Sequence, residues 1–269
     1  MKSATRRLAV GLEYDGTRYA GWQQQPGHET IQDRLQRALS AVADQAVAVA
    51  GAGRTDAGVH AVAQVAHFDT TAERPLRGWV LGANSHLPAD IAVHWAVEVD
   101  PSFHARRAAL ARCYRYCILQ RATRPALLRD RVCWVRGALD PAAMHEAAQA
   151  LVGEHDFSSF RAVECQSPTA MRRIDAISVR GEGPLVTVEV TANAFLHHMV
   201  RNIVGTLMEV GSGERSASSL AATLAARDRT QAGVTAPAGG LYLWRVQYPA
   251  AFRFPEPPGI PPWAMITGA

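Results

Sequence analysis

Apolar positions follow two different spacings in successive segments of this chain of 269 residues. Residues 8–14, LAVGLEY, alternate apolar residues with small or polar ones, which predicts a half-buried strand. The next periodic segment begins at Thr30, where T-I-Q-D is typical of a capping box, and it predicts a helix. The apolar positions of that helix are Ile31, Leu35, Ala38, Leu39 and Val42.

The residues that follow complete a β-α-β-β-α-β order. The predicted strands are 46–50, 62–68 and 91–99, and the predicted helix is 76–87. This order is the split pattern of a ferredoxin-like fold, in which the segment between strands 46–50 and 62–68 joins the two middle strands.

The same order recurs after about residue 105. Its elements are a strand at 111–120, a helix opened by Asp140 and Pro141, a hairpin of 174–179 and 185–190, a helix at 195–210 and a strand at 241–248, with an additional helix near 219–227 inserted before the last strand. We therefore expect an α+β fold of two pseudo-repeated ferredoxin-like halves, 1–105 and 106–250, whose antiparallel sheets join around a central basic cleft that would bind RNA. The proline-rich residues 251–269 are expected to form a surface tail.

Composition places the chain among soluble globular proteins, since 48% of its residues are apolar and 19% are charged. No apolar window is long enough to span a bilayer, and MKSATRR leads into a strand pattern instead of a signal peptide. We therefore expect a cytoplasmic protein with no membrane partner. The four cysteines form no C-x-x-C pair and no histidines lie in an H-x-x-x-H frame, so we expect no metal site.

Basic residues are concentrated in one part of the chain. The formal net charge is only +4, but residues 106–136 hold nine arginines and a single acid, Asp130. Tyr114, Tyr116 and Trp134 lie among them, which favours a surface that binds phosphates and stacks on bases. The alternative is compositional, because Lys2 is the only lysine and arginine therefore fills every other basic position.

The stretch GAGRTDAGVHA, residues 51–61, places Asp56 at the centre of a glycine-rich loop. A dinucleotide-binding loop would have its third glycine where Asp56 stands and would lead into a helix, whereas VAQVAHFD alternates as a strand does. Asp56 either caps a turn or is a catalytic group, because loops on rigid sheets often carry reactive residues. Arg54 would form a local ion pair or hold a phosphate.

Arg201 lies inside an apolar helix whose buried stripe is expected to be Leu196, Val200, Ile203, Leu207 and Val210. It has no acidic residue three or four positions away, and a buried guanidinium without an anion is costly. Its partner is then an RNA phosphate, solvent or Asp56. An arginine beside Asp56 would keep that carboxylate ionised and oriented.

Two further regions are candidates for substrate contact. Tyr114 and Tyr116 share one face of their strand, and core packing is the usual fate of such tyrosines. Residues 14–27, YDGTRYAGWQQQPG, carry Trp22 and Gln23, and they form either a flexible RNA-contacting loop or an ordinary long connection.

Several motifs together resemble the tRNA pseudouridine synthases. They are YDGTRYAGWQQQ, GRTDAGVHA, RCYRY, EHDFSSFRA, NAFLHHMVRNIVGTL and GLYLWRVQY, and they occur in order along nearly the whole chain. The resemblance implies isomerisation of uridine to pseudouridine in the tRNA anticodon stem-loop, at positions 38, 39 and 40, without a cofactor. It also implies a homodimer in which each tRNA contacts both subunits.

The resemblance further implies roles for individual residues. Asp56 matches the catalytic aspartate, as nucleophile or base, Tyr114 matches a tyrosine beneath the target base, and Arg54 and Arg201 match arginines around the carboxylate. We also expect substrate contacts from Trp22, Gln23, His60 and Arg115.

Two rival functions follow from the same residues. A non-catalytic RNA-binding protein with paired RRM-like halves fits the order of elements, but no aromatic RNP1 pattern lies on a middle strand. A glycosidase or nucleosidase would use similar chemistry at the sugar, but most glycosidases need a second acid, and the nearest to Asp56, Asp44 and Asp69, lie in flanking segments.

Overall fold

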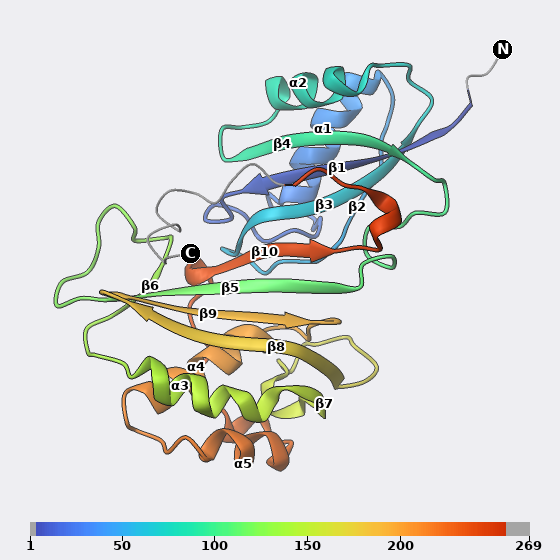
Figure 1. Cartoon of the computed structure of the whole chain (residues 1–269). Coiled ribbons are helices and arrows are strands. Elements are labelled where there is room, and N and C mark those ends of the chain that lie inside the picture. Colours follow the sequence, from blue (N-terminus) through green and yellow to red (C-terminus); the bar gives the residue numbers. More distant parts are fainter. Residues whose placement is uncertain (1–3, 257–269) are drawn as a thin grey trace. The chain divides into compact units, whose positions relative to one another are not determined.

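The computed structural model describes residues 4–256, which form a mixed α+β fold of ten strands and five α-helices (Figure 1). These residues divide into two compact units. The first unit comprises the described residues up to Leu110 together with those from Leu243 on, and the second comprises Ala111–Tyr242.

The first unit is built on an antiparallel sheet. Its elements are β1 (Arg6–Tyr14), α1 (Ile31–Ala43), β2 (Val49–Gly51), β3 (His60–Thr70), α2 (Leu76–His86), β4 (Ile91–Val99) and most of β10 (Leu241–Gln247). The strands lie in the order β4-β1-β3-β10, and the short β2 also pairs with β3. Up to β4, the element order is therefore the predicted β-α-β-β-α-β, with the loop of Asp56 between β2 and β3.

Helix α1 forms where its apolar spacing predicted it. The Thr30 hydroxyl accepts a hydrogen bond from the backbone N–H of Asp33 at 3.3 Å and so caps the first turn. Ile31, Leu35 and Leu39 are fully buried, and α1 and α2 pack against each other on one face of the sheet (Figure 1).

The second unit contains the remaining strands and three α-helices. Its elements are β5 (Ala111–Gln120), β6 (Cys133–Val135), α3 (Pro141–Ala148), β7 (Gly153–Asp156), β8 (Met171–Glu182), β9 (Leu185–Ala192), α4 (Met199–Gly211) and α5 (Ser219–Ala226). The strands lie in the order β5-β9-β8-β7, and β6 runs parallel to β5. Asp140 caps α3 as expected, since its carboxylate accepts from the N–H groups of Ala142 and Ala143. The described residues also include five short 3-10 helices: η1 (Gln149–Leu151), η2 (Ser158–Phe160), η3 (Arg229–Gln231), η4 (Ala238–Gly240) and η5 (Ala250–Phe252).

Helix α4 has the buried stripe that the sequence predicted, because Leu196, Val200, Ile203, Leu207 and Val210 are all buried. It begins later than expected, at Met199 instead of residue 195. The reason lies at His198, whose φ of 60° places it in the left-handed region, so regular helix starts only after it.

The last strand and the residues after it differ from the predicted division at 106–250 and 251–269. From Leu243 on, the chain belongs to the first unit, where the Tyr248 hydroxyl donates to the carbonyl of Ala105 at 2.6 Å. Phe252 and Phe254 are half-buried and contact Phe103, with ring centroids 4.9 and 5.4 Å away, so this part of the expected tail is packed. The rest of that tail, 257–269, lies outside the described residues.

None of the helices within residues 4–256 combines the length and apolar character that crossing a membrane requires.

Candidate active site

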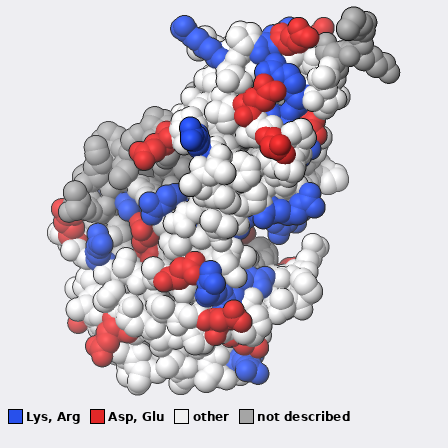
Figure 2. Space-filling view, turned by 45° about the vertical axis from the view of Figure 1, so that its right-hand side comes forward, with Lys and Arg blue, Asp and Glu red and all other residues white. Residues whose placement is uncertain are grey.

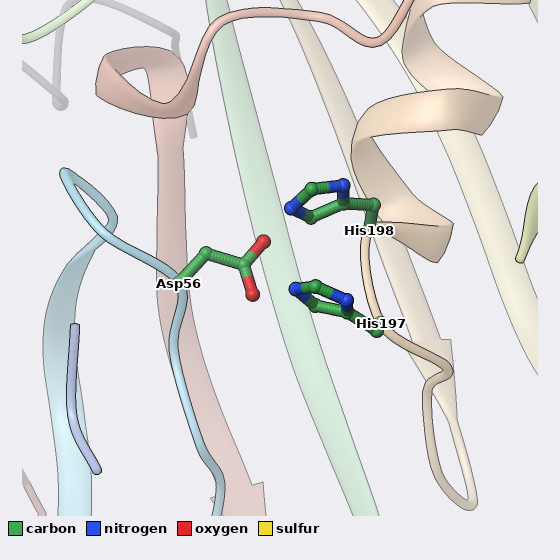
Figure 3. Close-up of side chains that lie close together, drawn as sticks. All are labelled: Asp56, His197 and His198. Atoms are coloured by element: carbon green, nitrogen blue, oxygen red, sulfur yellow. The ribbon is translucent and has the colours of Figure 1, made fainter. Parts of the chain in front are cut away.

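Asp56 lies in the loop between β2 and β3 of the first unit, and its side chain is labelled in Figure 3. The loop turns tightly around Asp56. The carbonyl of Asp56 accepts a hydrogen bond from the N–H of Val59 at 3.1 Å. Gly58, which has a φ of 77°, donates its N–H to the carbonyl of Tyr19 at 3.3 Å. The residues after Asp56 are therefore fixed by backbone bonds.

The residues before Asp56 are held by buried polar side chains. The Tyr14 and Thr55 hydroxyls are 2.9 Å apart, and the Gln64 amide donates to the carbonyl of Gly53 at 2.8 Å. The N–H of Gly53 also donates to the Gln64 side-chain oxygen at 3.3 Å, so this amide pairs with both backbone groups of Gly53. Burial raises the pKa of Tyr14 to about 12, which keeps its hydroxyl protonated at neutral pH. We call Tyr14, Thr55 and Gln64 the loop network.

Sequence reasoning missed the loop network, although one signal for it was present. Gln64 is the single amide in the apolar run VAQVAHF, and it is completely buried. A buried amide needs hydrogen-bond partners, so its position on a core strand beside a glycine-rich loop points to a structural task.

Trp22 and Gln23 support the loop and do not extend into solvent. Trp22 is only 2% exposed, and its backbone N–H donates to the carbonyl of Thr55 at 3.0 Å. Gln23 is half-buried and donates to the side-chain oxygen of Gln32 at 2.9 Å. The ring of Trp22 is in the core of the first unit, where it packs against the backbone of Gly51, and its expected contact with the substrate stays a prediction.

Arg54 precedes Asp56 in the sequence and His60 follows it, and the two side chains differ in exposure. His60 is 1% exposed, and its Nδ1 accepts from the N–H of Gly16 at 3.1 Å. This bond anchors the start of β3, and the expected contact of His60 with the substrate stays a prediction. Arg54 is exposed, as a side chain that meets a phosphate would be.

Tyr114 and Arg115 are neighbours on β5 and therefore point to opposite faces of the sheet. Tyr114 is 7% exposed, and its ring meets the edge of Phe195 at a centroid distance of 5.0 Å. Arg115 forms an ion pair of 2.7 Å with Glu189, its cross-strand neighbour on β9. Of the two expected substrate contacts on this strand, Arg115 thus has its charge engaged within the sheet.

Arg201 lies in the first turn of α4 and is half-buried. Its Nε donates to the carbonyl of Ala236 at 2.8 Å, and its own carbonyl accepts from the N–H of Ala236 at 3.1 Å. This reciprocal pair of bonds fixes the orientation of the guanidinium. Just before α4, the rings of His197 and His198 are 4.0 Å apart.

The arginines of residues 106–136 fall into two groups. Arg112 is buried and donates to the carbonyl of Asn193, and Arg115 and Arg131 are half-buried. The exposed arginines are Arg106, Arg107, Arg121, Arg124, Arg129 and Arg136. Figure 2 shows acidic side chains close to basic ones at several places on the face in view, which accords with the small net charge of +4.

Within each unit taken by itself, the described residues 4–256 contain no cluster of three His, Cys, Asp or Glu side chains that could hold a metal ion. Cys113, Cys117 and Cys133 are buried thiols without disulfides, and burial raises the pKa of Cys117 to about 12. Such thiols behave as small apolar side chains.

Comparison with known proteins agrees with the motifs of this loop and of α4. The family described as tRNA pseudouridine synthase matches residues 12–106 and 147–249, which include Asp56 and Arg201. The proteins named tRNA pseudouridine synthase A from Methylococcus capsulatus, Cronobacter sakazakii and Aeromonas hydrophila are similar to this chain over most of its length. The first is 55% identical over 246 residues, 91% of this chain and 91% of the relative. The other two are 53% identical over 94% of this chain and 93% of the relative, and 52% identical over 96% of each. With a family match over both units and relatives of this identity, the chain belongs to the tRNA pseudouridine synthase family.

Proposed function

We propose that this chain is an isomerase that converts uridine to pseudouridine in the anticodon stem-loop of tRNA, at positions 38, 39 and 40. The observation that carries the proposal is the Asp56 loop, in which bonds on both sides of the aspartate hold the backbone that carries the carboxylate. Relatives named for this reaction on tRNA share most of the sequence, and the family match includes the loop.

A single carboxylate suits the chemistry of this reaction. Breaking the bond between uracil N1 and C1′ of the sugar builds positive charge on the sugar, and Asp56 would stabilise it, add to it, or remove a proton at C2′. The detached uracil then turns and forms a new bond from C5 to C1′. The C5 proton is lost to solvent, and N1 takes up a proton. No second acid is needed to protonate a departing sugar oxygen, unlike in most glycosidases.

Arg201, Arg54 and Tyr114 complete the proposed site. Arg201 would pair with the Asp56 carboxylate, keeping it ionised and oriented, because an opposite charge favours the charged form. Arg54, exposed two residues before Asp56, would hold a nearby phosphate. Tyr114 would lie beneath the target base and guide its rotation by stacking.

The two units would then be repeats of one ferredoxin-like plan, with the substrate bound in a basic cleft. The exposed arginines of residues 106–136 would contact tRNA phosphates. The binding energy of these contacts would offset the cost of extruding the target base from its stack. The protein would act in the cytoplasm as a homodimer, with each tRNA contacting both subunits.

Incubation with unmodified tRNA tests the proposal. We expect carbodiimide adducts that resist alkali at the anticodon-arm uridines with the wild-type protein, and none with Asp56→Asn. The variant should bind the same tRNA with unchanged affinity. If the wild-type protein binds tRNA without forming pseudouridine, the chain is a non-catalytic RNA-binding protein with paired RRM-like units.

A further inference from the structure

Residues 232–237, which we call the strap, lie along α4 of the second unit. Five consecutive strap residues are bonded to neighbouring elements. Gly233 N–H donates to the Thr206 hydroxyl at 2.9 Å, Val234 N–H to Glu209 Oε1 at 3.4 Å, the Thr235 hydroxyl to Asn202 Oδ1 at 2.7 Å, and Ala236 N–H to the Arg201 carbonyl at 3.1 Å. Pro237 accepts from the Tyr116 hydroxyl of β5 at 2.7 Å.

The strap is held very close to the helix. A Cβ atom at Gly205 would overlap the carbonyl oxygen of Val234, so only glycine allows the two backbones this approach. Two of the helix residues that receive strap bonds, Asn202 and Thr206, are completely buried. Buried polar groups of this kind lose free energy if their partner leaves, so the strap has one well-defined position.

Arg229, in the 3-10 helix before the strap, closes the network. One terminal nitrogen of its guanidinium donates to Asn202 Oδ1 at 3.1 Å and to the Thr235 hydroxyl at 3.0 Å. The other donates to the carbonyls of Ala232 and Gly233, at 3.3 and 3.1 Å. Arg229 thus binds both the strap and the helix, and Asn202 is anchored in turn by donating to the carbonyl of Phe160 at 2.8 Å.

We propose that the strap positions the guanidinium of Arg201, and that Arg229 and Thr235 are positioning residues for the isomerisation. This inference rests on the proposed function, in which Arg201 orients the catalytic carboxylate. The link is the carbonyl of Ala236, which accepts from Arg201 Nε at 2.8 Å and leaves the terminal nitrogens of that guanidinium to face other partners. Thr235 is the adjacent residue, so a shift of its side chain off Asn202 moves the Ala236 carbonyl directly.

The alternative is that the network only stabilises the second unit. Both roles predict a lower melting temperature when the network is cut, so stability does not separate them. A positioning role also predicts a slower chemical step on bound tRNA, with unchanged affinity, because displacement of a reacting group by about 1 Å costs up to roughly 100-fold in rate.

The test uses single-turnover conversion of unmodified tRNA by the full chain at saturating enzyme. Thr235→Val keeps the shape and removes the hydroxyl, and we expect its rate to fall roughly 10-fold. Thr235→Ser restores the hydroxyl and should restore most of the rate. The matched control is Thr230→Val, because the Thr230 hydroxyl bonds to Asp228 in the same segment and makes no bond to α4. We expect that variant to convert tRNA at the wild-type rate.

A double-mutant cycle with Arg201→Ala decides whether Thr235 acts through Arg201. If it does, Arg201→Ala/Thr235→Val should convert tRNA within about twofold of Arg201→Ala alone, because there is no guanidinium left to misplace. Full additivity of the two losses would overturn the proposal, as would an unchanged rate for Thr235→Val. The proposed function fails by a different result, namely no pseudouridine from the wild-type protein. An undiminished bound-state rate in Arg201→Ala would refute both the role of Arg201 and this inference.

Discussion

The Asp56 loop and the first turn of α4 fix the position of a charged side chain in different ways. The loop of Asp56 is held through its backbone, because the side chains of the loop network bond to the preceding residues Gly53 and Thr55. Arg201 is held directly, by a bond from its own Nε to the strap. The comparison teaches that a loop can present a side chain through a fixed backbone, whereas a long flexible side chain on a helix needs a partner along its length.

Removing the carboxylate itself should have the largest effect. Asp56→Asn and Asp56→Ala should lower the single-turnover rate by at least roughly 10³-fold, since the group acts on the reacting atoms. The melting temperature and tRNA affinity should stay close to wild type, because the loop network fixes the backbone through Gly53 and Thr55, which both variants keep. Turnover within about tenfold of wild type would refute the assignment of Asp56.

Removing the guanidinium should have the next largest effect. We expect Arg201→Ala to lower the rate on bound tRNA by roughly 100-fold, the usual cost of losing one well-placed donor. Arg201→Lys should keep part of the rate, because an ammonium retains the charge and loses the planar two-pronged geometry. Weaker tRNA binding in both variants, with the bound-state rate unchanged, would make Arg201 a phosphate contact instead.

Cutting the loop network tests indirect positioning. Thr55→Val leaves the Tyr14 hydroxyl without its nearest partner, and we expect a loss of about 1–3 kcal/mol in the free energy of unfolding. The rate on bound tRNA should fall roughly tenfold, because the backbone next to Asp56 loosens. Thr55→Ser serves as the control and should keep most of both properties. A stability loss without any change in rate would show that the loop does not need this network for its geometry.

The last prediction concerns stability, and we expect no effect on the rate. It involves His67, a titrating residue that belongs to neither region. His67 on β3 accepts a hydrogen bond from the N–H of Ala105 at 3.2 Å, and burial lowers the pKa of His67 to about 4. The unfolded chain binds a proton at this residue near pH 6.5, whereas the folded chain does so only near pH 4. The contribution to stability is therefore complete above about pH 6.5 and is lost as the pH falls toward 4.

Denaturant unfolding at pH 7 and pH 4.5 measures this loss. We expect the free energy of unfolding to fall by about 2 kcal/mol more in the wild-type protein than in His67→Gln. As the pH falls, the amides of β3 should lose protection from hydrogen exchange before the amides of β9 do. Equal pH dependence in the two proteins would mean that other groups dominate acid unfolding.

Much of the fold could be predicted because local spacing and tertiary packing agree there. The stripe of α1 and the stripe of α4 follow from apolar periodicity alone. Strands β6 and β7 were not predicted, because segments of three or four residues carry no period. Nor did periodicity reveal that residues from Leu243 on belong to the first unit, since that depends on long-range pairing of β10 with β3.

For the candidate site, motifs singled out Asp56 and Arg201, but the surroundings of the neighbouring residues did not follow from residue type. Trp22 and His60 have the residue types of substrate contacts, but both are in the core. The partners of Arg201 in the strap lie about 35 positions later in the sequence, and no spacing rule links them. Which polar side chains face the substrate and which face the backbone is decided by packing.

Close backbone contact around Asp56 also restricts how the sequence is able to change. A Cβ at Gly21 would lie 2.6 Å from the carbonyl oxygen of Thr55, and one at Gly51 would lie 2.5 Å from the ring of Trp22. Most single-nucleotide changes in a glycine codon that alter the residue introduce a side chain, so both positions should be depleted of variants in a selected library. The Asp56 loop thereby imposes purifying selection on residues up to 35 positions before Asp56 (56 − 21).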